Sequence, residues 1–163
     1  MVSWIMACVK KVNFVVLVNG APTYFFKSHR GLRQGCPLSP LLFILVMDGL
    51  SRMIDRAKRD GTIQGVLISP SIYLSHVLFV DDVLLMGAST PEEWSKFFDI
   101  ISSFCRATGM EMSQNKSSFI SSEGILDQSV RDIFPIEVIP LEMCFKYLGF
   151  NLKPNCYRFR DWV

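Results

Sequence analysis

The feature that most constrains this sequence is a pair of adjacent acidic residues between two short apolar segments. Asp81 and Asp82 separate Val77–Val80 from Val83–Met86. Because a charge buried without a partner loses much of its solvation energy, the pair cannot lie inside one continuous buried strand. We therefore expect the two segments to pair as strands, with the aspartates at the tip of a tight hairpin. There the carboxylates can bind divalent cations, although a hairpin turn without function also fits these residues.

A second motif is a glycine-rich, basic loop that leads into a helix. The loop runs from Arg30 to Pro37, and Ser39-Pro40 follows, which predicts Ser39 as the N-cap and Pro40 as the first helical residue. Backbone N–H groups and the helix dipole at such an N-terminus attract phosphate. The loop alone is equally typical of an ordinary connection. Apolar residues at helical spacing then predict a helix ending at Asp60-Gly61: Leu38, Leu41, Leu42, Leu45, Gly49, Leu50, Met53, Ile54 and Ala57.

Turn signals and apolar periodicity predict the other elements. Asn19-Gly20 between Phe14–Val18 and Thr23–Lys27 indicates a hairpin, and β structure is expected over 62–68 and 73–88. Thr90–Glu93 has the pattern of a capping box, and Gly109 is the expected end of that helix. Its predicted core face contains Trp94, Phe97, Phe98, Ile101, Phe104 and Cys105.

Shorter elements complete the expected order. A strand is predicted near Ser117–Ser121, a short helix near Gln128–Phe134, and a last strand over Phe145–Leu152. Strands that alternate with two amphipathic helices favour an α+β fold, with helices packed on one face of an antiparallel sheet.

Composition limits the classes of protein and of partner. Half of the 163 residues are hydrophobic, which excludes a disordered or fibrous chain. The net charge is only +2, but no Asp or Glu precedes Asp48, while that stretch holds five basic residues: Lys10, Lys11, Lys27, Arg30 and Arg33. Five widely spaced cysteines and two histidines argue against a disulfide framework and a structural zinc site. No apolar run has the length of a membrane span, so no membrane partner is expected.

Four motifs, taken in order and spacing, resemble the palm motifs of reverse transcriptases. They are Arg30–Phe43, Phe79–Asp82, Gly109–Lys116 and Tyr147–Gly149. The resemblance covers nearly the whole chain and is strongest to the non-LTR (LINE-type) retrotransposon group found in plants. It implies a partial reverse-transcriptase palm over residues 1–163, an RNA template, a DNA primer and deoxynucleoside triphosphates as partners, and Mg²⁺, or Mn²⁺ in its place, as cofactor.

The resemblance also implies roles for single residues. Asp81 and Asp82 correspond to metal-binding catalytic carboxylates, and Val80 is a mild departure from the family's usual Ala or Met. Lys116 corresponds to a catalytic lysine that assists the leaving pyrophosphate. The motif around the loop implies contacts with nucleotide or template for Arg30, Arg33, Gln34 and Gly35. The last motif implies a primer grip formed by Tyr147, Leu148 and Gly149.

One departure from the family pattern bears on activity. Family members place a further metal-binding Asp on a strand upstream of the Asn-Gly hairpin, and here no carboxylate precedes Asp48. We therefore expect a palm without the fingers and without this first catalytic strand, and an isolated chain that is inactive in two-metal nucleotidyl transfer. Three alternatives stay open: a non-catalytic nucleic-acid-binding or interaction module, a non-functional retrotransposon remnant, and a fragment that does not fold stably.

Overall fold

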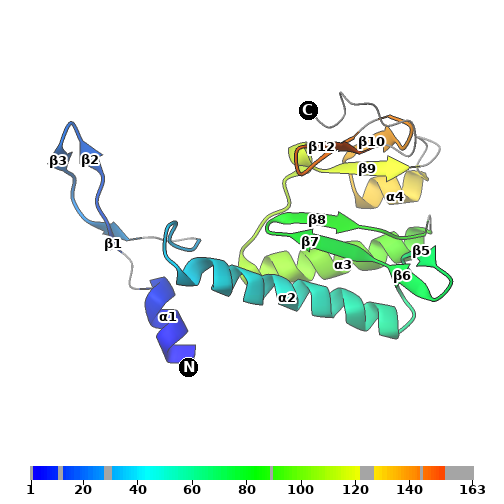
Figure 1. The fold of residues 1–163 in the computed structure, drawn as a ribbon, viewed down its shortest axis with the longest axis horizontal. Coiled ribbons are helices and arrows are strands. Elements are labelled where there is room, and N and C mark those ends of the chain that lie inside the picture. Colours follow the sequence, from blue (N-terminus) through cyan, green and yellow to red (C-terminus); the bar gives the residue numbers. More distant parts are fainter. Residues whose placement is uncertain are drawn as a thin grey trace. The chain divides into compact units, whose positions relative to one another are not determined.

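A computed structural model describes residues 2–10, 13–27, 31–88, 90–121, 127–143 and 145–152. The chain divides into two compact units, Met1–Gly49 and Leu50–Val163 (Figure 1). Helix α2 (Leu38–Arg59) contributes its first half to one unit and its second half to the other. Among the described residues, no helix is both long and apolar enough to cross a membrane.

The first unit contains a helix and a long hairpin. Helix α1 spans Val2–Lys10. In the hairpin, β1 (Asn13–Phe14) pairs with β4 (Phe26–Lys27), and β2 (Leu17–Val18) pairs with β3 (Ala21–Pro22), both antiparallel. Asn19 and Gly20 join β2 to β3 and both have positive φ, 50° and 81°, as a type I′ turn requires. The predicted Asn-Gly hairpin is confirmed.

Helix α2 differs from the prediction at its beginning. It starts at Leu38, so Ser39 is already helical and is not the N-cap. The Ser39 hydroxyl instead donates to the Arg33 carbonyl oxygen at 2.7 Å. The end is as predicted, since Arg59 is the last helical residue and Gly61, with a φ of 73°, follows in a left-handed turn. The predicted apolar stripe is buried at Leu50, Ile54 and Ala57, whereas Leu41 and Leu45 in the first unit are more than 60% exposed.

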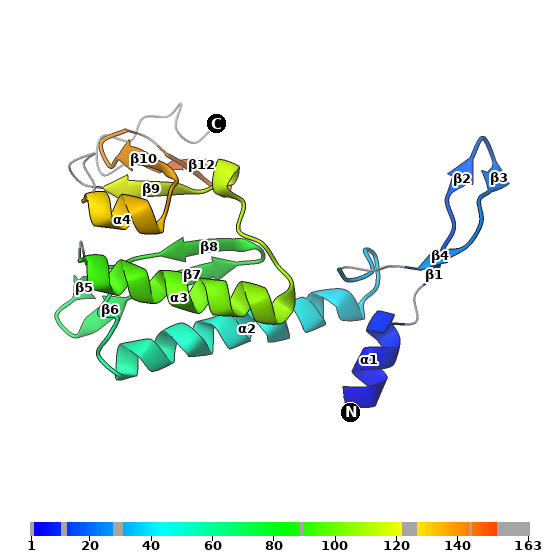
Figure 2. The same cartoon turned by 180° about the vertical axis from the view of Figure 1, so that it is seen from behind.

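The second unit begins with two consecutive hairpins. In the first, β5 (Val66–Ser69) pairs with β6 (Ile72–Leu74), with a bulge between Leu67 and Ser69. In the second, β7 (His76–Phe79) pairs with β8 (Asp82–Leu85). Helix α3 (Pro91–Thr108) runs along one face of β7 and β8, as the two opposite views in Figures 1 and 2 show. The predicted hairpin around the aspartates therefore forms, but its strands begin and end one residue earlier than the predicted segments, so that Val80 lies in the turn and Asp82 begins β8.

Helix α3 begins and ends at the predicted residues, but it is not closed by a capping box. Thr90 is the N-cap residue and Gly109 the C-cap, where the Gly109 N–H donates to Cys105 O; the Thr90 side chain makes no capping hydrogen bond. Glu93, the predicted reciprocal partner, is only 4% exposed. Its Oε1 accepts from the backbone N–H groups of Gln64 and Gly65, and its Oε2 from Ala88. Backbone N–H groups from outside α3 thus occupy the Glu93 carboxylate, which is not left free to form the predicted capping box.

The C-terminal part of the second unit corrects the prediction of one antiparallel sheet. Strand β9 (Ser118–Ser121) pairs in parallel with β10 (Glu137–Pro140), because helix α4 (Gln128–Ile133) lies in the connection between them. The predicted last strand is instead a hairpin of β11 (Phe145–Tyr147) and β12 (Phe150–Leu152), because Leu148 and Gly149 form a turn. The described strands form six two-stranded ladders, so the α+β class is supported and the single sheet is not.

The core of the second unit lies around α3. Trp94 stacks edge-on against Phe119 of β9, with ring centroids 4.5 Å apart, and also contacts Phe97 and Phe134. Phe98, predicted to be buried, is 38% exposed and packs edge-on against Phe134. The buried apolar residues of this unit are Leu50, Ile54, Ala57, Ile63, Trp94, Phe97, Ile100, Phe104, Val130 and Phe134.

Candidate active site

The aspartate pair lies at the tip of the β7–β8 hairpin. Phe79 is the last paired residue of β7 and faces Asp82, the first residue of β8, so Val80 and Asp81 form the two-residue turn. Both aspartates are exposed. The hairpin therefore presents two carboxylates from adjacent residues to solvent at its tip.

The turn contains a strained residue. Val80 has a φ of 52°, in the left-handed region that a β-branched side chain rarely adopts. Such a conformation costs on the order of 1–3 kcal/mol and persists only where the surrounding structure imposes it. Here the paired strands β7 and β8 impose the reversal of the chain, and Asp81 is the residue carried at its apex.

The donor set at this tip suits a hard cation. Two carboxylates offer oxygen ligands, and Mg²⁺ is commonly held by one or two protein carboxylates, with water and substrate phosphate completing its shell. In the part of the chain that the structure describes, no group of three or more His, Cys, Asp or Glu side chains could hold a metal ion. The tip can therefore provide part of a metal site, with the other ligands coming from substrate, water or another segment.

The glycine-rich loop of the first unit forms a tight turn before α2. The Cys36 N–H donates to Arg33 O at 3.4 Å, and Gly35 has a φ of 79°, which favours glycine at this position. Arg33, Gln34 and Gly35 are all exposed. The backbone N–H of Leu38 holds the pKa of the Cys36 thiol below its usual value, with the Ser39 hydroxyl and the Arg33 charge acting in the same sense against partial burial. These groups all lie in or next to the first turn of α2.

Lys116 lies in a short 3₁₀ helix, η1 (Gln114–Lys116), which leads into β9. Its N–H donates to Ser113 O, and its side chain is exposed. In both Figure 1 and Figure 2, η1 and the tip of the β7–β8 hairpin lie at the same end of the second unit. The lysine is thus available to bind an anion at that end.

The predicted primer grip is the turn of the β11–β12 hairpin. Leu148 and Gly149 have φ values of 51° and 86°, as in a type I′ turn, and Tyr147 pairs with Phe150 at its base. The Tyr147 hydroxyl is buried and has no hydrogen-bond partner among the described atoms. Because this hydroxyl is turned away from solvent, the exposed parts of the motif are Leu148 and Gly149.

The predicted site residues are distributed over both units. Asp81, Asp82, Lys116 and the Tyr147–Gly149 turn belong to the second unit, and the Arg33–Gly35 turn belongs to the first. Arg30 lies outside the described residues. A surface hollow of about 430 Å³ contains none of these residues, since it lies beside the beginning of α3, lined by Gly61, Thr62, Gln64, Ala88, Thr90, Glu92, Glu93, Ser95, Lys96 and Asp99.

Two structural roles near the site were not predicted from the sequence. The Ser39 hydroxyl holds the Arg33 carbonyl, and so fixes the turn that carries Gln34 and Gly35. The Val80 backbone strain at the aspartate turn is the other. The sequence pattern did not indicate the second, because the apolar segments Val77–Val80 and Val83–Met86 leave Asp81 and Asp82 for the turn, whereas the turn residues are Val80 and Asp81.

The motifs at these positions agree with a comparison against protein families. The family described as reverse transcriptase (RNA-dependent DNA polymerase) matches residues 1–152. The chain belongs to the reverse transcriptase family. The match includes all four motifs, from the loop before α2 to the β11–β12 turn, and it confirms the resemblance.

Two curated proteins contain segments similar to this chain. An uncharacterized mitochondrial protein of Arabidopsis thaliana is 46% identical over 67 residues, which are 40% of this chain and 55% of that protein. A retrovirus-related Pol polyprotein from the type-1 retrotransposable element R2 of Popillia japonica is 28% identical over 178 aligned residues, covering 100% of this chain and 28% of the polyprotein. The chain thus spans about half of one relative and about a quarter of the other. A non-LTR element as the source of this reverse transcriptase sequence is supported.

Proposed function

We propose that this chain is a palm segment of an RNA-directed DNA polymerase and that Asp81 and Asp82 provide its metal-binding carboxylates. The observation that carries the proposal is the aspartate pair at the tip of a two-stranded hairpin, in a chain whose family is reverse transcriptase. The partners would be an RNA template, a DNA primer and deoxynucleoside triphosphates.

Different residues of this chain would hold the metal ion, position the nucleotide and neutralise the leaving group. Asp81 and Asp82 would hold Mg²⁺, which when bound lowers the pKa of the attacking primer hydroxyl and stabilises charge on the triphosphate. Arg33, Gln34 and Gly35 would position the incoming nucleotide, with the N-terminus of α2 favouring its phosphates. Lys116 would neutralise the leaving pyrophosphate.

The turn at Leu148 and Gly149 would hold the primer end through its backbone. A two-residue type I′ turn exposes backbone N–H and C=O groups at its apex, and Leu148 and Gly149 are both exposed. The buried hydroxyl of Tyr147 favours a packing role for that ring, which would anchor the hairpin from beneath.

We expect the 163 residues by themselves to be inactive in primer extension. Two-metal nucleotidyl transfer draws carboxylates from more than one segment, whereas no Asp or Glu precedes Asp48, which lies within α2. Each 1.36 kcal/mol of lost transition-state stabilisation lowers the rate about tenfold. We therefore expect no detectable primer extension by these residues alone.

The test is primer extension on a primed RNA template with Mg²⁺. The 163-residue chain is compared with the same chain joined to the upstream Asp-bearing strand of an active relative. The joined protein should extend the primer, Asp81→Asn in it should abolish extension, and Asp99→Asn, at an exposed carboxylate of α3, should not. Robust extension by the 163-residue chain, or extension that survives Asp81→Asn, would refute the proposed roles.

Binding of metal provides a second readout that does not require catalysis. Addition of Mn²⁺ should broaden NMR signals around Asp81 and Asp82 at weak affinity, since two carboxylates leave most of the ion's shell to water. The non-catalytic alternative, a nucleic-acid-binding module, predicts binding of nucleic acid without this broadening.

A further inference from the structure

The hairpin arm of the first unit, residues 13–27, exposes two aromatic side chains that it does not pack. Tyr24 is 96% exposed and Phe25 is 79% exposed. An aromatic side chain of this size normally buries 150–250 Å², so two adjacent rings left in water indicate a surface that is covered by a ligand or partner.

Both rings sit on a segment whose backbone is held on each side. Before them in the chain, Thr23 N–H donates to Val16 O at 2.9 Å, and Val16 N–H donates to Thr23 Oγ1 at 3.1 Å. After them, the ring of Phe26 stacks on that of Phe14, with centroids 5.9 Å apart. Tyr24 and Phe25 therefore lie between two fixed points of the arm, so a ligand would find them partly ordered.

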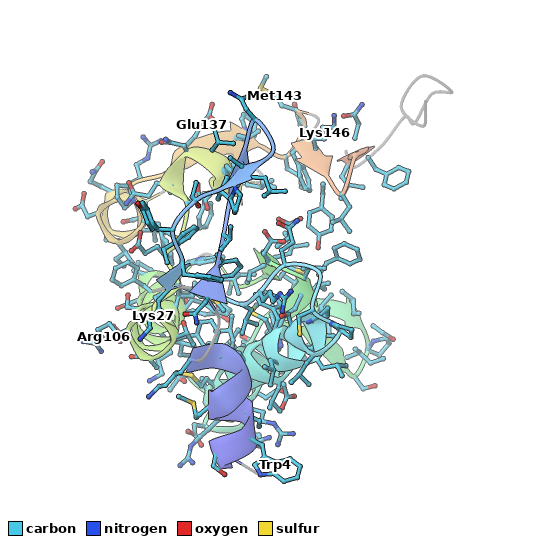
Figure 3. All side chains as sticks on the ribbon, turned by 90° about the vertical axis from the view of Figure 1, so that its left-hand side faces the viewer. Trp4, Lys27, Arg106, Glu137, Met143 and Lys146 are labelled. Atoms are coloured by element: carbon cyan, nitrogen blue, oxygen red, sulfur yellow. The ribbon has the colours of Figure 1, made fainter. Side chains whose placement is uncertain are left out.

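The charge around the arm is of one sign. Residues 1–47 hold five basic residues and no acidic one, whereas residues 48–163 hold twelve basic and fifteen acidic. Lys27 ends β4 directly after Phe26, is exposed, and extends from the base of the arm (Figure 3). An exposed aromatic pair in a basic segment without carboxylates is complementary to a polyanion that carries flat apolar groups.

We propose that this arm binds single-stranded nucleic acid, with bases stacked on Tyr24 and Phe25 and a phosphate near Lys27. The inference rests on the proposed function, to which it adds a contact outside the aspartate site. Base–aromatic stacking tolerates any sequence because every base has a π-face, and paired bases inside a duplex are not available for it. The arm should therefore prefer single strands and discriminate little among sequences.

The experiment measures binding of a fluorescein-labelled oligouridine to the full 163-residue chain by fluorescence anisotropy. The double variant Tyr24→Ala/Phe25→Ala should bind at least about tenfold more weakly, since stacking contributes roughly 1–3 kcal/mol per base. Lys27→Gln should lower the slope of log K against log salt by about 0.7, the value for one phosphate of a single strand. Urea unfolding of each variant should match wild type, because the replaced side chains are exposed.

Matched variants separate stacking from general apolar contact. Tyr24→Phe keeps a ring and should bind like wild type, and Leu17→Ala, at an exposed aliphatic side chain of the same arm, should do so too. Tyr24→Leu/Phe25→Leu keeps apolar surface without rings and should bind as weakly as the alanine variant. An unlabelled duplex of the same length should compete poorly.

Three results would overturn the proposal. They are full binding by the alanine double variant, full binding by the leucine double variant, which would indicate apolar docking of a protein or lipid, and the absence of measurable binding by wild type. Primer extension by the joined protein and its Asp81→Asn variant test different residues and a different readout. Failure of the arm proposal is therefore distinguishable from failure of the proposed polymerase function.

Discussion

The carboxylate of Glu93 joins three segments of the second unit, and its replacement should destabilise the unit strongly. It accepts hydrogen bonds from Gln64 at 2.8 Å, Gly65 at 2.9 Å and Ala88 at 2.6 Å. It thereby ties the loop after α2 and the segment after β8 to the first turn of α3. Hydrogen bonds to a charged group contribute about 1.5–3 kcal/mol each, and a buried N–H left without an acceptor costs about 1–3 kcal/mol.

The magnitude differs between two variants. In Glu93→Ala the buried Gly65 amide loses its acceptor outright, and the two partly buried amides can recover part of theirs from water. The expected loss is about 3–5 kcal/mol, a large share of the 5–15 kcal/mol by which domains are usually stable. In Glu93→Gln one oxygen can still serve Gln64 and Gly65, but the new NH₂ group faces the Ala88 N–H, so about 2 kcal/mol should be lost.

The assay is urea unfolding of the full chain followed by far-UV circular dichroism, with linear extrapolation to water. Glu92→Gln is the matched control, because Glu92 is exposed in the same helical turn and also interacts with the α3 dipole. The difference between the Gln variants at positions 93 and 92 thus isolates the hydrogen bonds. Equal free energies of unfolding for these two variants would refute the interpretation that Glu93 anchors the segments.

Three further predictions follow from single positions. Burial lowers the pKa of His76 below its usual value, so below about pH 6.5 the unfolded state binds more protons than the folded state. The free energy of unfolding, measured in urea, should therefore decrease as the pH is lowered through this range, and by less in His76→Gln. Iodoacetamide should alkylate Cys36 before Cys105, because local hydrogen bonds lower the pKa of the Cys36 thiol and burial raises that of Cys105. Peptide mass spectrometry measures the order of labelling, and the reverse order would contradict this prediction. Gly65→Ala should lower the free energy of unfolding by more than about 2 kcal/mol, because its Cβ would lie 2.5 Å from Leu74 O. Gly61→Ala has a similar φ but open space around its Cβ, and should lower it by only about 1–2 kcal/mol. Equal urea midpoints for the two variants would refute the clash.

Features that depend on neighbouring residues could be predicted from the sequence. The Asn19-Gly20 turn, the hairpin around Asp81 and the ends of α3 at Thr90 and Gly109 all follow from local backbone preferences and apolar spacing. The family could be recognised for the same reason, because its motifs are short contiguous segments. The residues that carry the proposed chemistry can therefore be predicted from the sequence alone.

Features that depend on competition between distant groups were decided only by the tertiary structure. Glu93 fits a capping box by spacing, yet three backbone amides from two other segments take its oxygens, because their burial would otherwise leave them unpaired. Ser39 likewise fits an N-cap by its position before Pro40, yet it lies within α2 and its hydroxyl donates a hydrogen bond to the Arg33 carbonyl oxygen. The strands that the structure describes form separate two-stranded ladders, one of them parallel. Strand pairing depends on which segments the connections bring side by side, and not on the apolar pattern of any one strand.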